Sequence, residues 1–311
     1  MSLGWCCGSP RTTRSIARRR SGWSTVAGSE SQCWIGDPSV GHGEGGWWDS
    51  GIGVLRHVDM HVGDIVTVTD AGADRTPVSD VAALIRARRS GGYVVAVRDG
   101  FRLLDEDWRL ECEVPVFHDP GMRMNEGGVD PSGRLYCGSM AYDASTGAGT
   151  LYRLDPDLAV HVALENVSIP NGLVWTDDGH TALHADTLGG QIRAYDFDLD
   201  TGLFGASRVH VAVPADHGGP DGMALDAEGG LWVAMWGGAA VHRYAPDGSI
   251  AQVIDLPVTN PTSCAFGGAD GTTLFVTTSK EGVDIGAEPL AGRVCAVDVG
   301  VPGADVHAFA G

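Results

Sequence analysis

Short apolar runs alternate with glycine-bearing polar turns along the chain, and one such phrase recurs six times. Each instance is a β-type run, a turn that contains Gly, and a second β-type run. Turns of this kind favour hairpins, because glycine tolerates positive φ and aspartate caps the turn. The six segments span residues 47–59, 90–100, 127–140, 172–186, 222–236 and 264–278.

One glycine in each turn marks a repeat of about 40 to 50 residues. These glycines are Gly51, Gly91, Gly133, Gly179, Gly229 and Gly271. A second pair of short apolar runs follows each hairpin, so each unit has room for about four strands. Each unit must stack on its neighbours to bury both of its faces. Six such units predict an all-β fold, a six-bladed β-propeller with about four antiparallel strands per blade.

Two segments depart from the repeat. Residues 81–88 are rich in good helix formers, but we assign them to a strand and its loop because tertiary context often overrides propensity. Residues 1–35 carry an arginine cluster and lack the apolar stretch of a secretory signal. We interpret residues 1–35 as a disordered or non-native extension, with a targeting or anion-binding arm as the alternative. Residues 36–311 form the predicted propeller domain.

Charge and cysteine content narrow the classes of partner. The chain has 311 residues, a formal net charge of −19 and a sequence pI of about 4.7. Such a surface repels nucleic acid and anionic membranes. Seven cysteines occur without a C-x-x-C pair, which favours neither a zinc site nor a disulfide framework and indicates a reducing, cytoplasmic setting.

Polar residues recur at the start of the first strand of several units. Counting eight residues back from the turn glycine gives Asn125, Asn171, Asp221 and Ser263, and Glu44 lies seven before Gly51. If these strands are innermost, equivalent positions form a ring around one mouth of the channel. Carboxylate and amide oxygens suit Ca²⁺, Mg²⁺ or Mn²⁺. The alternative is that the Asn-Gly and Asp-Gly pairs merely form turns.

A dinucleotide fingerprint, G-x-G-x-x-G, also matches residues 41–46. That motif requires a strand before it and a helix after it. The following residues, Trp47 to Gly53, cannot open a regular helix. We therefore interpret Glu44 as the functional residue of this segment.

Six ordered motifs resemble the gluconolactonase, senescence-marker-protein and luciferin-regenerating-enzyme family, also called regucalcin-like proteins. The matching residues are Glu44-Gly45-x-x-Trp48, Arg123-x-Asn125-x-Gly127-x-Val129-Asp130-Pro131-x-Gly133-Arg134, Gly138-Ser139-Met140, Pro170-Asn171-Gly172-Leu173, Pro220-Asp221-Gly222 and Thr262-Ser263-Cys264-Ala265-Phe266-Gly267-Gly268. The resemblance runs from about residue 38 to the C-terminus.

This resemblance implies a six-bladed propeller with one divalent metal ion in the central channel. By resemblance, the metal ligands are Glu44, Asn171 and Asp221, and Asp221 is also the general base. The positions that match substrate-binding residues are Arg123, Asn125 and Asp143. Three residues depart from the family pattern: Gly46 replaces a common Pro, Glu126 replaces a common Asp, and Asp143 is one methylene shorter than the usual Glu.

The sequence therefore predicts a metal-dependent hydrolase that opens a small sugar lactone. Ca²⁺ is the expected ion, with Mg²⁺, Mn²⁺ or Zn²⁺ as alternatives. Two other functions remain open: a non-catalytic calcium- or metal-binding protein, and a propeller phosphotriesterase.

Three rival features receive structural interpretations. We interpret Cys137 as a buried, inert strand cysteine. His57, Asp59 and His61 alternate along one strand and could share a face, but we interpret them as surface or core residues. The acidic run 105–107 is interpreted as a solvated turn.

Overall fold

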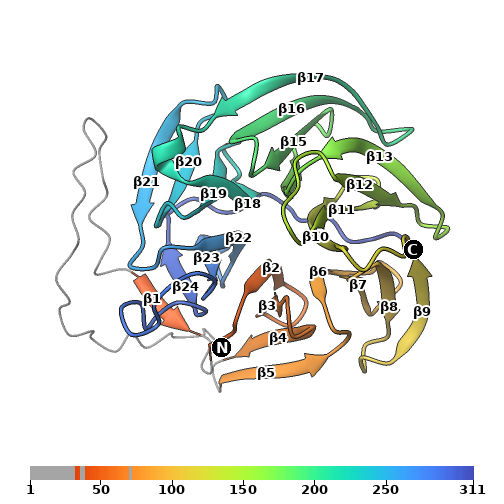
Figure 1. Ribbon diagram of the computed structural model, residues 1–311, viewed down its shortest axis with the longest axis horizontal. Helices are drawn as coiled ribbons and strands as arrows, with labels where there is room; N and C mark the ends of the chain where they lie inside the picture. Colours follow the sequence, from red (N-terminus) through yellow and green to blue (C-terminus); the bar gives the residue numbers. More distant parts are fainter. Residues whose placement is uncertain (1–31, 36–38, 70–71) are drawn as a thin grey trace.

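Six four-stranded antiparallel sheets stand around a central axis in the computed structural model, which describes residues 32–35, 39–69 and 72–311 (Figure 1). The innermost strands are β2, β6, β10, β14, β18 and β22, and each contacts its neighbours in ring order until β22 meets β2. The predicted all-β, six-bladed propeller is thus confirmed.

Five blades consist of four consecutive strands, with the innermost strand first. Blade 1 holds β2 (Gly43–Asp49), β3 (Val54–Asp59), β4 (Asp64–Thr69) and β5 (Gly72–Pro77). Blade 2 holds β6 (Ala82–Ala87), β7 (Tyr93–Val97), β8 (Gly100–Leu104) and β9 (Leu110–Pro115). Blade 3 holds β10 (Met122–Val129), β11 (Leu135–Ala141), β12 (Gly149–Leu154) and β13 (Val160–Val167). Blade 4 holds β14 (Pro170–Trp175), β15 (Thr181–Asp186), β16 (Gln191–Asp198) and β17 (Leu203–Ala212). Blade 5 holds β18 (Gly219–Leu225), β19 (Leu231–Trp236), β20 (Ala240–Tyr244) and β21 (Ile250–Asp255).

Blade 6 is assembled from both ends of the described chain. Its inner strands are β22 (Pro261–Gly267), β23 (Thr273–Thr278) and β24 (Val294–Asp298), and its outer strand is β1 (Gln32–Ile35). β1 pairs antiparallel with β24, with Trp34 opposite Cys295. Residues 32–35, which the sequence predicts to be part of the N-terminal extension, instead complete a blade. The remainder of that extension, residues 1–31, lies outside the described residues.

The segment with helical propensity is a strand, as predicted. Residues 82–87 form β6, the inner strand of blade 2, and Leu84 and Ile85 are almost fully buried there. Burial of both side chains against neighbouring strands outweighs a helix preference that amounts to a few tenths of a kcal/mol per residue. Within the described residues, helix is limited to the 3₁₀ turn η1 (Ala215–His217), and no helix there is long and apolar enough to cross a membrane.

Aromatic and aliphatic side chains fill the spaces between blades. Between blades 3 and 4, the Tyr136 ring packs against Trp175, Phe197 and Phe204, with ring centroids 5.3 to 6.2 Å apart. Each such ring removes a large apolar area from water. Hairpins that could not be stable alone are therefore held together by their neighbours.

A β-bulge interrupts the pairing of every inner strand with its second strand. In each case one extra residue lies on the inner strand, for example between Pro170 and Leu173, between Pro220 and Met223, and between Glu44 and Trp47. Bulges bend a strand and redirect side chains, and they often accompany functional sites. The bulge follows Pro220 in blade 5 and Pro261 in blade 6, so the blade 6 residue equivalent to Asp221 is Thr262. Counting eight residues back from Gly271 gives Ser263 instead, and that prediction is wrong by one residue.

Glycine follows Glu44, Asn171 and Asp221 because neighbouring inner strands approach closely there. A Cβ at Gly45, whose φ is +60°, would lie 2.9 Å from the Ala83 carbonyl oxygen of β6. A Cβ at Gly222 would lie 2.7 Å from the Ser263 Cα of β22. These pairs lie inside strands, so the alternative that they merely form turns is wrong.

We predict that Gly222→Ala destabilises the propeller. The added methyl group must displace the backbone of β22, and overpacking of this kind costs about 1–3 kcal/mol. The expected result is a melting temperature several degrees below that of the wild type. Gly205→Ala is the matched control, because its Cβ would meet no atom closer than 3.4 Å. Equal melting temperatures for the two variants would contradict this account of the inner-strand contact.

Candidate metal centre

Three buried carboxylates converge in the channel, each from a different inner strand. They belong to Glu44 on β2, Glu126 on β10 and Asp221 on β18, and one oxygen of each lies within 4.8 Å of the others. The three residues are at most 4% exposed. The bulges place these side chains at one point, although the residues are up to 177 positions apart in sequence (221 − 44).

A hydrogen-bonded chain of polar side chains adjoins the carboxylates. Arg123 Nη1 donates to Asn125 Oδ1 at 2.5 Å, and Asn125 Nδ2 donates to Asn171 Oδ1 at 3.0 Å. Asn171 Nδ2 in turn donates to Thr187 Oγ1 at 2.6 Å, and that hydroxyl donates to the Pro220 carbonyl oxygen. This chain fixes the Asn171 amide, with its oxygen facing the Asn125 side.

Burial and crowding disfavour the charged forms of all three carboxyl groups. Desolvation raises the pKa of Glu44 well above its ordinary value, and the charge of Glu126 adds to the effect. The pKa of Asp221 is also raised well above its usual range, first by burial and then by Glu44. Burial raises the pKa of Glu126 to about 8, although Arg86 opposes the shift. A buried set of like charges is unfavourable unless a cation or protons neutralise it.

Two of these carboxylate oxygens have no hydrogen-bond partner in the described residues. They are Asp221 Oδ1 and Glu126 Oε2. Buried polar atoms are normally satisfied, so each unpaired oxygen calls for a partner such as an ion or water. An oxygen-only donor set suits a hard divalent cation such as Ca²⁺ or Mg²⁺. The residues therefore fit the metal expected from the sequence.

Five of the six predicted site residues lie in this inner region, and one does not. Glu44 and Asp221 belong to the carboxylate cluster, whereas Arg123, Asn125 and Asn171 form the adjoining chain. Asp143, by contrast, lies on the exposed rim just beyond β11. Its Oδ1 accepts bonds from the backbone N–H and hydroxyl of Ser145, which lower its pKa.

Glu126 is the member of the cluster that sequence reasoning missed. The eight-residue spacing selects its neighbour Asn125, and the family resemblance marks Glu126 only as a replacement for a common Asp. The bulge between Met124 and Gly127 holds both residues, and both side chains are buried. The sequence did offer one signal for Glu126, because it directly follows Asn125, a residue predicted to line the channel.

The rival features stay separate from this centre. Cys137 is buried, and burial raises the pKa of its thiol to about 12, so it is inert at neutral pH. His57 is buried with its Nδ1 beside the Val58 carbonyl oxygen, whereas Asp59 pairs with Arg75 and His61 pairs with Glu281. His57, Asp59 and His61 therefore do not form one site.

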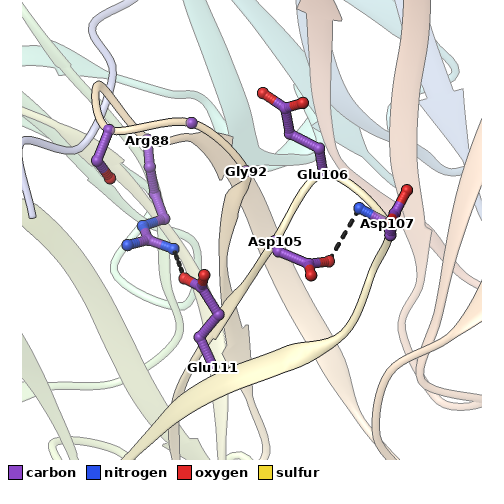
Figure 2. Close-up of a pocket in the computed structure, with 8 residues that line it drawn as sticks. Arg88, Gly92, Asp105, Glu106, Asp107 and Glu111 are labelled. Carbon is purple, nitrogen blue, oxygen red and sulfur yellow. Dashed lines mark hydrogen bonds and ion pairs between the residues drawn. The ribbon is translucent and has the colours of Figure 1, made fainter.

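A surface hollow of about 550 Å³ lies at the β6–β7 and β8–β9 turns of blade 2 (Figure 2). Arg88 Nη1 pairs there with Glu111 Oε2 at 2.5 Å, and Asp105 Oδ1 accepts the Asp107 N–H at 2.9 Å. Glu106 and Asp107 are exposed in a turn. The acidic run 105–107 is thus a solvated turn, as predicted, and we do not consider it a binding site.

The C-terminal segment lies across the end of the channel opposite the bulges. Figure 1 shows this segment crossing the propeller toward the end of the chain beside blade 2. Residues 304–307 line a cavity of about 90 Å³, together with Trp47, Trp175 and the Glu126 side of the channel. This cavity reaches the carboxylate cluster at Glu126.

Comparisons with known proteins agree with this architecture. Residues 42–280 match the family described as SMP-30/Gluconolactonase/LRE-like region. The chain is 36% identical to regucalcin of Xenopus laevis over 284 residues, which cover 86% of this chain and 95% of that protein.

Two solved structures with similar folds are a regucalcin and a luciferin-regenerating enzyme. A structure titled as a calcium-binding protein, regucalcin, from Agrobacterium tumefaciens aligns with a TM-score of 0.82 and 27% identity, covering 90% of this chain and 97% of that one. A luciferin-regenerating enzyme aligns with a TM-score of 0.80 and 26% identity, covering 88% and 96%. The chain therefore belongs to the SMP-30/gluconolactonase/LRE-like family.

Proposed function

We propose that the protein is a divalent-metal-dependent lactonase that opens a small sugar lactone. The observation that carries this proposal is the cluster of three buried carboxylates in the channel, two of whose oxygens are unpaired in the described residues. Membership of a family whose description includes gluconolactonase supports the same activity.

Glu44, Asn171 and Asp221 would hold the metal. Glu126, which has an oxygen within 4.8 Å of oxygens of Glu44 and Asp221, would be a fourth oxygen donor. Ca²⁺ is the favoured ion because all the donors are carboxylate or amide oxygens. The Agrobacterium tumefaciens structure is titled as a calcium-binding protein, which supports the same choice. Mg²⁺, Mn²⁺ and Zn²⁺ are alternatives. The bound ion would supply Lewis-acid polarisation of the lactone carbonyl.

Asp221 would act as the general base. It is buried, and one of its oxygens is unpaired and free to accept a proton from the attacking water. Water forms the new C–O bond at the carbonyl carbon, the ring C–O bond breaks, and the proton held by Asp221 passes to the departing ring oxygen. The product is an open-chain hydroxy acid. Neutralisation of the cluster by a cation keeps Asp221 ionised for this role.

Arg123 and Asn125 would orient the lactone. The Arg123–Asn125 hydrogen bond and the bond from Asn125 to Asn171 fix both groups beside the proposed ligand. Preorganised donors of this kind lower the cost of reaching the reactive geometry. Asp143, on the exposed rim, would contact a sugar hydroxyl at the entrance, so it would influence substrate choice more than the reaction itself.

A second candidate function is metal binding without catalysis. The same oxygen ligands serve both purposes, and the Agrobacterium tumefaciens regucalcin is described as a calcium-binding protein. A cytoplasmic setting is consistent with the free thiols of Cys112, Cys137, Cys264 and Cys295.

Removal of metal should abolish lactone hydrolysis. Chelation with EDTA leaves the buried carboxylates without their cation, and add-back of Ca²⁺ should restore activity, with Mg²⁺, Mn²⁺ and Zn²⁺ tested in turn. The substrates would be glucono-, galactono-, xylono- and arabinonolactone, with one phosphotriester as comparison. Hydrolysis that persists after complete metal removal would contradict the mechanism. Tight metal binding with no turnover of any substrate would favour the non-catalytic role.

Asp221→Asn should lower kcat for the lactone by at least 10²-fold, because removal of a general base costs about 10²–10⁴-fold. Asp247→Asn is the matched control, since Asp247 is an exposed turn residue of the same blade. Metal content would be measured alongside, so that loss of the base is distinguished from loss of the ion. Near-normal hydrolysis by Asp221→Asn would exclude this residue as the base.

The metal-free protein should lose stability as the pH rises from 5 to 8. The pKa of Glu126 is about 8 in the folded protein, whereas an unfolded Glu titrates near 4.3. Between these values the folded protein keeps a proton that the unfolded chain has released. The free energy of unfolding therefore falls, by up to about 1.4 kcal/mol per pH unit for each such carboxyl. Thermal melts would show this slope, and Glu126→Gln should reduce it. An unchanged slope in that variant would rule out Glu126 as its source.

A further inference from the structure

A second cluster of metal-binding side chains lies at the same mouth of the channel. It consists of His42, His61 and Glu281, whose ligand atoms all lie within 4.8 Å of one another. His42 directly precedes β2, His61 lies in the turn between β3 and β4, and Glu281 follows β23. Only the fold brings these three residues together, and the lactonase mechanism uses none of them.

The side chains face one another at short range. His61 Nε2 lies 2.6 Å from Glu281 Oε1, and His42 Nδ1 lies 3.7 Å from Glu281 Oε2. The two imidazole rings stack with centroids 4.9 Å apart. The hydroxyl of Ser279 is 2.8 Å from His42 Nδ1, so a fourth polar group adjoins the same point.

Two of the three groups are already held in place. The His42 side chain is only 7% exposed and lies between the His61 ring and the Trp236 ring, whose centroid is 5.7 Å away. The Glu281 backbone is fixed at both ends, since its N–H donates to Ser279 Oγ and its carbonyl oxygen accepts from Asn260 Nδ2. The His61 and Glu281 side chains are 38% and 46% exposed, which leaves an open path for an ion.

The two nitrogens of His42 face different carboxylates. Nδ1 faces Glu281, whereas Nε2 lies 3.6 Å from Glu44 Oε1. If Nδ1 bound a metal, the proton would reside on Nε2 and point toward a buried carboxylate. Histidines that bind metals usually direct their second N–H to a carboxylate or carbonyl in this manner, because it fixes the tautomer and raises ligand basicity.

We propose that His42, His61 and Glu281 form a second cation site that binds a divalent transition metal of the Zn²⁺ type. Two imidazoles and one carboxylate are a ligand set found in zinc sites that keep an open position. Imidazole selects transition metals, whereas the oxygen-only cluster beside Glu44 selects hard ions such as Ca²⁺. The two sites therefore differ in metal preference, and the second does not depend on the proposed lactonase activity.

This site spans the seam at which the ring of blades closes. His42 and His61 belong to blade 1, and Glu281 belongs to blade 6. The backbone already bridges this seam between His42 and Ser279, and Lys280 N–H donates to the Gly41 carbonyl oxygen at 2.9 Å. A metal held here would crosslink the first and last blades. Its binding should stabilise the folded protein as well as occupy the mouth.

The test compares Zn²⁺ binding by the full-length wild type with that of His61→Ala and Glu281→Gln. Proteins freed of metal with a chelator would be titrated with Zn²⁺ in the presence of saturating Ca²⁺. We expect each variant to bind one equivalent of Zn²⁺ less than the wild type, or to bind that equivalent more weakly. The loss of affinity should exceed the roughly 10- to 100-fold that follows when a residue that only hydrogen-bonds a metal ligand is removed. His180→Ala, an exposed histidine of blade 4, is the control.

Two further readouts separate a metal site from a simple ion pair. Zn²⁺ at about a hundred times its Kd should raise the wild-type melting temperature by roughly 5–10 °C, and the rise should be absent in His61→Ala. Co²⁺ bound by imidazole should give a visible absorption band in the wild type and the control but not in that variant. Equal Zn²⁺ stoichiometry and equal melting shifts in wild type and both variants would overturn the proposal and leave only a His61–Glu281 ion pair across the seam. Because differences between variants are measured, metal bound by cysteines elsewhere cancels.

Discussion

The close approach of the six inner strands around a narrow channel is the constraint on which the rest of the structure depends. Each inner strand contacts the inner strand on either side of it, and at Gly45 and Gly222 the neighbouring strand is too near for a Cβ. Every inner strand in this ring also carries one bulge. The bulges then bring buried polar side chains from different blades to one point.

That convergence carries an energetic cost that points to function. Glu44, Glu126 and Asp221 are buried together, and their pKa values are raised because water is excluded and like charges are close. A protein selected for stability alone would place apolar groups or a paired cation there. The propeller tolerates the cluster because the apolar contacts between its blades stabilise the fold independently of the channel. A divalent cation bound there would remove the repulsion, and the same carboxylates could then serve as its ligands.

Two ligand chemistries meet at one mouth of the propeller. The inner group contains only oxygen donors, whereas the outer group combines His42 and His61 with Glu281. His42 lies between them, with one nitrogen toward each group. The outer group also joins the first blade to the last. At the outer edge, β1 completes blade 6 by pairing with β24. At the inner edge, the contact between His61 and Glu281 joins blade 1 to blade 6.

The sequence by itself determined the all-β class and the count of six blades, because hairpin turns and strand alternation are local properties. The turn spacing also selected Glu44 and Asp221, which the structure brings together with Glu126. The resemblance to a known family added Arg123 and Asp143. Only the tertiary structure decided that residues 32–35 complete blade 6, that Glu126 joins the carboxylates and that Asp143 stays on the rim. It alone also joined His61 to Glu281 rather than to His57. These outcomes depend on bulge register and on contacts between residues far apart in the chain, and no local pattern encodes either.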